Sequence, residues 1–247
     1  MNTRALGYIV LVLAIAVLGY FAFVKNHTAK NAETPVQSQT EEKLTILQKT
    51  DKKVSIENKN ISIDVTYPVF EAVPSNTNAA IKKFVDDEVA MIKSLAAESK
   101  QSSFVTTYTL NASYEIEQAN TSYVSLVFTV NEDTGGAHPN QYFRTFNYNL
   151  KTGVSMNLAD VFAGDAGYFA ILKPKIKVAV HDALEANLKE QGDNDTNPDS
   201  ILFEDISKLK EDAFQHFTFG SNYVRFFFSP YDIAPYVFGP IVVNVQR

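Results

Sequence analysis

Cysteine is absent from the 247-residue chain, and histidine occurs only four times. Without cysteine the chain forms no disulfide bond, offers no thiolate to a metal ion, and has no residue for the acyl chains of a lipoprotein. The chain also lacks the Gly-x-Ser-x-Gly nucleophile pattern and a phosphate-binding glycine loop. Few residues are therefore left for catalytic chemistry, and the fold has to be stabilised by its hydrophobic core.

Clustered positive charge is absent as well. The formal net charge is −6, and residues 55–134 carry five lysines against eleven acidic residues. Binding to a phosphate backbone needs a clustered basic face, so nucleic acid is excluded as a partner. The acidic middle segment either keeps the surface soluble or attracts a cationic protein.

Only one long hydrophobic run is present, and it covers residues 5–24 without a charge. A helix of this length spans about 30 Å, the thickness of the hydrocarbon core of a bilayer. Cleaved signals usually have a shorter run that ends in small residues, whereas Tyr20, Phe21 and Phe23 stand here. We expect a signal anchor over residues 1–25 that leaves the folded part on the extracytoplasmic side of the membrane; cleaved export is the alternative.

The pattern beyond the anchor predicts an α+β fold. Residues 26–52 are polar and indicate a flexible tether. Within a predicted N-terminal domain, 53–131, alternating residues indicate strands over 61–67, ended by Pro68, over 104–116 and over 124–130. Helical spacing between the first two strands favours a helix over 78–97, capped by Asn76, Thr77 or Asn78.

A second predicted domain covers residues 132–247. It should contain a strand over 142–150, a tight turn at 151–153, a helix over 167–190, a hairpin over 217–228 and a last strand over 241–245. Pro174 marks either the start of that helix or a kink in it. Together the elements predict antiparallel sheets with packed helices in two small lobes, meeting near residue 130.

The stretch EDTGGAHPNQYF, residues 132–143, contains the first candidate site, formed by Gly135, Gly136 and His138. His138 has no second histidine nearby with which to hold a metal ion, and no nucleophile pattern accompanies it. Glycines favour a sharp backbone turn between two strands. This loop is therefore interpreted as a structural corner or a ligand-contacting loop, without a catalytic or metal-binding role.

The stretch PYDIAPYVFGP, residues 230–240, contains the second candidate site, formed by Tyr231, Asp232 and Tyr236. Tyrosine rings offer flat faces to sugar rings or to a protein partner, although they also wedge loops into cores. The acidic loop 192–200 lacks the glycine and glutamate of a calcium-binding loop, so we expect it to be solvated. No metal ion or other cofactor is expected.

Three stretches together resemble a known family: GGAHPN at 135–140, FNYNLKTG at 146–153 followed by LADVF at 158–162, and FFFSPYDIAPYVFGP at 226–240. They are similar to the extracytoplasmic domain of unknown function in RsiV-type lysozyme-sensing anti-sigma factors and PdaC-type peptidoglycan deacetylases. The strand ending at Tyr67-Pro68 and the following helix resemble the companion domain that precedes it. The resemblance covers residues 54–247 and implies an α+β module of the cell envelope, without the sigma-binding and deacetylase parts.

The functional expectation is a membrane-anchored, non-catalytic module. It would bind cell-wall glycan or a wall-degrading enzyme such as lysozyme through Gly135, Gly136, His138, Tyr231, Asp232 and Tyr236. One alternative is a wall-glycan hydrolase or deacetylase-type enzyme, in which His138 acts with a carboxylate. Another alternative is a structural subunit of an envelope complex.

Overall fold

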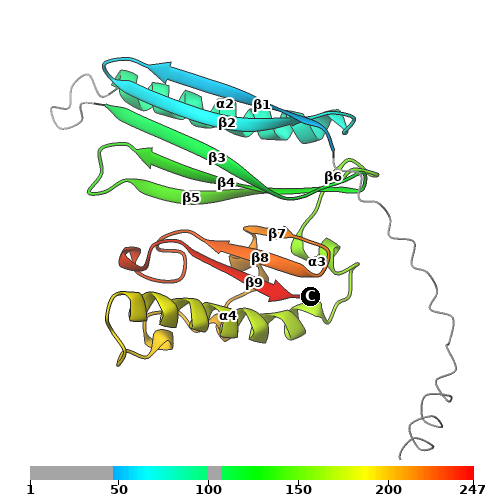
Figure 1. Cartoon of the computed structure of the whole chain (residues 1–247), viewed down its shortest axis with the longest axis vertical. Coiled ribbons are helices and arrows are strands. Elements are labelled where there is room, and N and C mark those ends of the chain that lie inside the picture. The colour runs from blue at the N-terminus through cyan, green and yellow to red at the C-terminus, as the bar shows by residue number, and fades with distance from the viewer. Residues whose placement is uncertain (1–46, 99–106) are drawn as a thin grey trace, which may run out of the picture. The chain divides into compact units, whose positions relative to one another are not determined.

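The computed structural model describes residues 47–98 and 107–247. The predicted anchor at 5–24 and most of the predicted tether lie outside these residues. Within them, no helix is both long enough and apolar enough to cross a bilayer. The strands and α-helices are β1 Lys49–Glu57, β2 Ile61–Phe70, α2 Ser75–Glu98, β3 Tyr108–Ala119, β4 Tyr123–Asp133, β5 Asn140–Asn149, β6 Val154–Ser155, α3 Leu158–Val161, α4 Tyr168–Glu190, β7 Phe217–Phe219, β8 Tyr223–Phe228 and β9 Ile241–Gln246 (Figure 1).

Six strands form a large sheet in the order β1-β2-β3-β4-β5-β6, and α2 packs on one of its faces (Figure 1). Every neighbouring pair is antiparallel except β2 and β3, which run parallel and are connected through α2. Parallel neighbours need such a crossover, which α2 supplies. The α+β prediction is confirmed, but the sheet is mixed where antiparallel strands were expected.

The core of the large sheet follows the predicted periodicities. Ile81, Val85 and Ile92 of α2 are buried, as the helical spacing indicated. Alternate residues of β4 from Val124 to Val130 face them. The helix begins at Ser75, however, so the three residues predicted as caps lie inside its first turn. One of them, Asn78, instead bonds the backbone N–H and C=O of Phe70 at 3.0 and 2.8 Å.

Strand β2 continues through Pro68, where the sequence predicted its end. The N–H of Tyr108 in β3 donates to the carbonyl of Asn60, so even-numbered residues of β2 direct their backbone groups toward β3. β3 pairs only with residues 61–65. The nitrogen of Pro68 therefore faces an unpaired edge, where a missing N–H does not interrupt a ladder.

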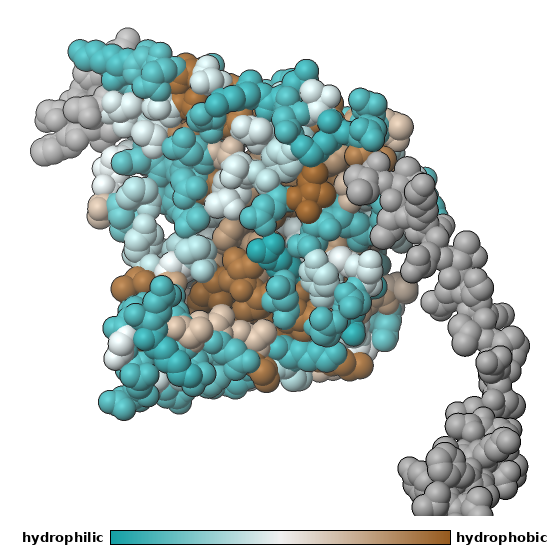
Figure 2. Space-filling view, in the orientation of Figure 1, coloured by the Kyte–Doolittle hydropathy of each residue, from teal (hydrophilic) through white to brown (hydrophobic). Residues whose placement is uncertain are grey.

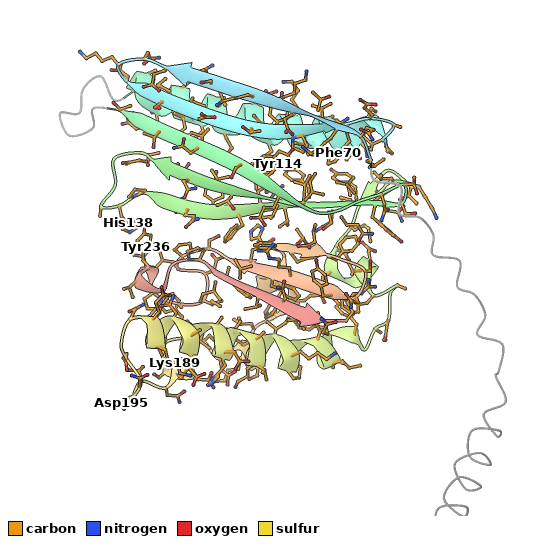
Figure 3. The ribbon with its side chains drawn as sticks, viewed as in Figure 1. Phe70, Tyr114, His138, Lys189, Asp195 and Tyr236 are labelled. Carbon is orange, nitrogen blue, oxygen red and sulfur yellow. The ribbon has the colours of Figure 1, made fainter. Side chains whose placement is uncertain are left out.

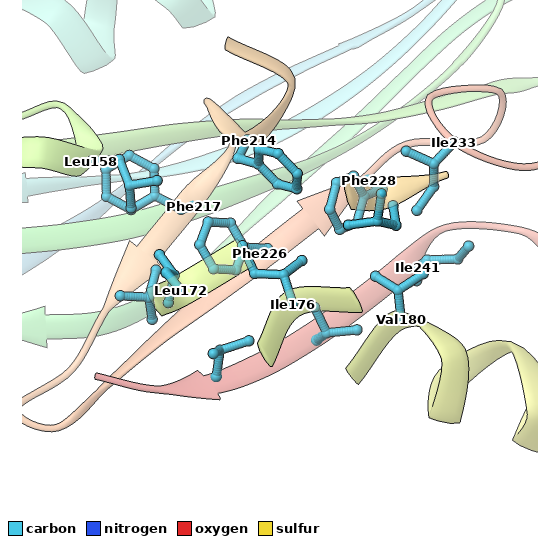
Figure 4. Packing of buried hydrophobic residues seen from close by; sticks show 14 of the residues in the cluster. Leu158, Leu172, Ile176, Val180, Phe214, Phe217, Phe226, Phe228, Ile233 and Ile241 are labelled. Carbon is cyan, nitrogen blue, oxygen red and sulfur yellow. The ribbon is translucent and has the colours of Figure 1, made fainter. Parts of the chain in front are cut away.

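A second sheet of three antiparallel strands, in the order β7-β8-β9, is covered by α4 (Figure 1). Residues at every fourth position of α4 are buried against it, which confirms the predicted face. Pro174 lies inside the helix rather than at its start. Figure 4 shows the packing between the two elements, in which Leu172, Ile176 and Val180 contact a group of phenylalanines.

The observed division of the chain differs from the one predicted near residue 130. β5 pairs with β4 along its whole length, and β6 extends the large sheet to Ser155. The core of the small sheet begins only at Leu158. At the other end of the large sheet, β1 starts at Lys49, inside the range predicted as tether. The strand was not predicted because its first part, residues 49–53, is exposed and consists of polar and charged residues.

Two buried polar side chains join the sheets. The free edge of β7 directs the carbonyl of Phe217 and the N–H of Phe219 toward the large sheet. Asn147 donates its amide to the former at 2.8 Å, and the Ser125 hydroxyl accepts from the latter at 2.9 Å. Ser125 also donates to the Asn147 side chain at 2.7 Å. The edge of the small sheet is thus hydrogen-bonded to a face of the large one.

Apolar contact beside this network is small. A cluster of Val127, Phe143 and Phe227, with Val242 packed against it, lies between the sheets. Figure 2 shows hydrophobic side chains gathered over β8 and β9 on an otherwise largely hydrophilic face. Polar pairs border the cluster, including Arg225 with Glu115 at 3.0 Å. The contact between the sheets therefore depends on matched polar groups more than on buried area.

Replacing Asn147 with alanine should lower the free energy of unfolding by about 2 kcal/mol, since the Phe217 carbonyl would stay buried without a donor. Denaturant unfolding of the full chain measures this change. The exposed Asn111→Ala variant on β3 is the matched control and should change stability by less than about 0.5 kcal/mol. Equal losses in the two variants would contradict the role given to Asn147.

Candidate functional site

The two loops predicted as candidate sites lie together. His138, from the β4–β5 loop, stacks on Tyr236, from the β8–β9 connection, with ring centroids 3.8 Å apart and planes 26° apart (Figure 3). The Tyr231 hydroxyl lies 3.4 Å from Nε2 of the same imidazole. These three residues, here called the aromatic cluster, come from segments about 95 positions apart in the chain, so the fold brings them together.

A backbone carbonyl holds the stack in place. The Tyr236 hydroxyl donates to the carbonyl oxygen of Pro139 at 3.0 Å, and Nδ1 of His138 lies 2.9 Å from that oxygen. Nδ1 is therefore the protonated nitrogen in neutral histidine, which leaves Nε2 to accept from Tyr231. Within the described residues, the ring nitrogens of His138 contact a carbonyl and a phenol and no carboxylate.

Tyr231 adopts an unusual backbone conformation, with φ of 72°, and its side chain is 56% exposed. A residue with a Cβ atom costs about 1 kcal/mol in this region relative to glycine. An exposed aromatic ring held at that cost is an observed outlier of the kind that accompanies binding sites.

The two glycines of the first loop have different roles. Gly135 has φ of 83°, and its N–H donates to the Asp133 side chain at 2.9 Å, so it forms the turn. Gly136 lies outside the left-handed region, and an added Cβ would meet only the His138 carbonyl, at 3.6 Å. Both glycines were predicted as part of the site. Only Gly135 has a backbone conformation that favours glycine.

Asp232 stabilises its own loop. Its carboxylate accepts from the N–H of Ser229 at 2.6 Å, and its N–H donates back to the Ser229 carbonyl. It contacts no ring of the aromatic cluster through a hydrogen bond within residues 47–98 and 107–247. Asp232 directly follows Tyr231 in the sequence, and its polar contacts are those of a turn.

A groove of about 1230 Å³ begins beside the aromatic cluster. The end of the groove beside the cluster is lined by Asn140, Pro230 and Asp232. Pro230 and Asp232 flank Tyr231 in the sequence, and Asn140 follows Pro139. β5 runs along the groove, and α2 forms one side. The other side comes from the 3₁₀ helix η4, Glu211–Phe214, and the residues that follow it. A volume of this size accommodates several sugar or amino-acid units.

The groove contains a carboxyl group in an unfavourable environment. Burial raises the pKa of Glu88, although the hydrogen bond from Tyr142 opposes the change. Burial and the same bond raise the pKa of Tyr142. Among the described residues, the Oε2 atom of Glu88, which lines the groove, is buried without a hydrogen-bond partner; so is the Oε2 atom of Glu132, which does not line the groove. Burial also lowers the pKa of His216. Unpartnered acceptors beside a groove favour a ligand that brings donors.

Sequence reasoning missed this part of the site. Glu88 stands in an acidic run on a helix, where most carboxylates are solvated, and nothing in the run distinguishes it from Asp86 or Asp87. The available signal was its spacing of four from Phe84, which placed both residues on one face of α2.

The acidic loop is held by local bonds. Asp193 accepts from the N–H groups of Asp195 and Thr196, both at 3.0 Å, and Asp199 lies 3.0 Å from Nδ1 of His181. In the part of the chain that the structure describes, no group of three or more histidine, aspartate or glutamate residues is arranged to hold a metal ion.

Two family models match the chain. Residues 54–141 match the family described as "Deacetylase PdaC", and residues 159–247 match the family described as "Protein of unknown function (DUF3298)". The predicted resemblance is confirmed. The PdaC match ends within β5. The DUF3298 match starts one residue after Leu158, where the core of the small sheet begins, and it includes Tyr231 and Tyr236.

A curated relative has both parts. The chain is 23% identical over 238 residues to the peptidoglycan-N-acetylmuramic acid deacetylase PdaC of Bacillus subtilis strain 168. The aligned region covers 96% of this chain and 48% of the relative. The chain thus spans about half the length of the curated relative that it matches.

Solved structures support the fold. A DUF3298 family member from Bacteroides fragilis is 15% identical with a TM-score of 0.53, over 81% of this chain and 91% of that one. A DUF3298 family protein from Pseudomonas aeruginosa is 12% identical with a TM-score of 0.51, over 81% and 88%. At these identities the likeness establishes the α+β fold alone.

Replacing Glu88 with glutamine should make stability less sensitive to pH. Because the folded-state pKa of Glu88 lies above its ordinary value of 4.5, the wild-type chain loses stability as pH rises from that value through the raised one. Glutamine stays neutral, so the stability of the variant relative to wild type should increase between pH 4 and pH 7. Denaturant unfolding across this range measures the difference. The exposed Glu71→Gln variant should track wild type, and parallel curves for Glu88→Gln would contradict the assignment.

Proposed function

We propose that this chain is a non-catalytic module of the cell envelope that binds cell-wall glycan. The single observation that carries the proposal is the exposed aromatic cluster at the end of the groove. The pairing of PdaC-type and DUF3298-type segments, and the name of the Bacillus relative, support a ligand in peptidoglycan. Aromatic faces with adjacent amide and carboxylate groups are suited to sugars, because the apolar face of a pyranose stacks on a ring while its hydroxyls take hydrogen bonds.

The geometry supports a defined mode of binding. Tyr231 is 56% exposed and its hydroxyl lies 3.4 Å from Nε2 of His138, so part of its ring surface is open to a ligand. Asn140 and Asp232 at the adjoining end of the groove supply donors and acceptors for hydroxyl and acetamido groups. In the proposal one sugar stacks on the cluster, and the substituents of that sugar enter the groove.

Attachment to the membrane forms part of the proposal. The uncharged run at residues 5–24 would anchor the chain, and the described residues would lie outside the cytoplasmic membrane, within reach of the wall.

Lysozyme or a similar cationic protein is a second candidate partner. The observation that favours it is the excess of acidic residues along the groove, which would attract a basic surface. A lysozyme pull-down at low and at high salt tests this candidate, because such binding should weaken as salt screens the charges.

Replacing Tyr231 or Tyr236 with alanine should weaken binding of soluble peptidoglycan fragments by roughly tenfold, since a stacking face worth about 1 kcal/mol or more is lost. Calorimetric titration of the full chain measures the affinity. Val237→Ala, in the same loop and with a side chain 68% exposed, is the matched control and should bind as wild type does. Unchanged affinity in both tyrosine variants, with unfolding temperatures kept, would count against the cluster as the binding site.

His138→Ala separates binding from catalysis. The imidazole nitrogens contact a phenol and a carbonyl, an arrangement that supports stacking rather than proton transfer to a nucleophile. We expect wild-type protein to release no labelled fragments from peptidoglycan, and the variant to bind more weakly because Tyr236 loses its stacking partner. Release of fragments by wild type that is abolished in His138→Ala would favour the hydrolase alternative instead.

A further inference from the structure

Within the described part of the chain, strand β5 has a free edge along most of its length. β6 pairs only with Tyr148 and Asn149. The N–H of Met156 donates to the carbonyl of Asn147 at 2.8 Å, which shows that odd-numbered residues of β5 direct their backbone groups away from β4. By the alternation of a strand, Gln141, Phe143 and Thr145 therefore present N–H and C=O groups on the free side.

The residues that carry these backbone groups line the groove. No hydrogen bond joins their backbone N–H or C=O groups on this side to another residue of segments 47–98 and 107–247. Three donor–acceptor pairs at two-residue spacing are complementary to one ligand chemistry, an extended peptide backbone. A sugar alone does not match that spacing.

The groove admits a narrow occupant. α2 flanks the edge on one side, while η4 and Ser229, Pro230 and Asp232 flank it on the other. An occupant of the edge would lie between these two walls, which favours a single strand over the edge of another folded sheet. The free segment from Gln141 to Thr145 is about 17 Å long, which matches a peptide of four or five residues.

The charged residues that line the groove indicate which kind of ligand it would bind. The groove is lined by five carboxylates against one lysine and one arginine, namely Asp87, Glu88, Glu211, Asp212 and Asp232 against Lys83 and Arg144. Lys83 is already paired with Asp87. A second copy of this chain, with its net charge of −6, is a poor occupant, and a peptide with a free amino group is a good one.

We infer that the free edge of β5 binds a short, amino-bearing extended peptide as an added strand, and that this peptide is the one attached to the wall glycan. The inference rests on the proposed function. A sugar on the aromatic cluster would place its peptide at Asn140, where the free edge begins. The peptide backbone then pairs with residues 141–145, and its amino group meets the acidic side of the groove.

Alternate N-methylation of the peptide tests the pairing. The probe is the stem peptide alanyl-γ-D-glutamyl-lysyl-D-alanyl-D-alanine, titrated into the full chain by calorimetry. One peptide variant is methylated at the backbone amide nitrogens of the lysine and of the last D-alanine. The other is methylated at the backbone amide nitrogen of the D-alanine between them. One of these two should bind about tenfold more weakly and the other nearly as well as the parent, because only one set of amides faces β5. Acetylation of the lysine amine should also weaken binding. Equal effects of the two methylation patterns would overturn strand addition.

Proline substitution tests the protein side. Thr145→Pro and Gln141→Pro each remove an N–H from the free edge, where proline is compatible with the fold, and Thr145→Ala and Gln141→Ala are the matched controls. Both proline variants should lose peptide binding while the alanine variants keep it, with unfolding temperatures recorded for all four. Peptide binding retained by both proline variants would overturn the inference.

Glycan fragments stripped of peptide separate this inference from the proposed function. The proline variants should bind stripped glycan as wild type does, whereas Tyr236→Ala should bind it weakly. If wild type binds stripped glycan but not the stem peptide, strand addition fails and the proposed function stands. If it binds the peptide but no glycan, the proposed function fails and the pairing with β5 stands.

Discussion

The hydrogen bonds that join the side chains of Ser125 and Asn147 to the free edge of β7 determine how the two sheets fit together. Each sheet has its own helix and its own apolar core. Among the described residues the apolar contacts between the sheets are few: the cluster of Val127, Phe143 and Phe227, and Tyr123 of β4 against Phe219 of β7. Without Ser125 and Asn147 the edge of the small sheet would be buried against the large one with unpaired backbone groups, which is unfavourable. The network contributes to the register of the contact, from which the groove and the aromatic cluster arise.

Much of the fold was predictable because burial imposes periodicity. The spacing of Leu172, Ile176 and Val180 in α4, and the alternation in β4, arise directly from facing a core. The parallel pairing of β2 with β3 was missed, because the alternation in each strand is the same for either direction of pairing; the signal for it was the helix predicted between the two strands. Strand β1 was missed for a related reason: it lies at the edge of the sheet, and its first half is exposed.

The sequence indicated which two loops could form the site, but it did not indicate how their side chains contact one another. Turn-forming glycines and exposed tyrosines marked both loops, yet only the fold shows that His138 stacks on Tyr236. The role of Asp232 in its own turn, and the buried position of Glu88, depend on neighbours distant in sequence. Such contacts leave no local pattern, because each residue meets its partners only after the sheets have come together.

The stacked arrangement of His138, Tyr231 and Tyr236 has a thermodynamic consequence. Rings already packed against one another, with hydroxyls bonded to the facing loop, have few alternative rotamers left to lose when a ligand arrives. Part of the entropy that these side chains would otherwise lose on binding is thus already lost during folding. At Tyr231 the folded chain also carries the cost of a strained φ. A surface of this kind can hold a small, weakly apolar ligand that a mobile loop of identical composition would release.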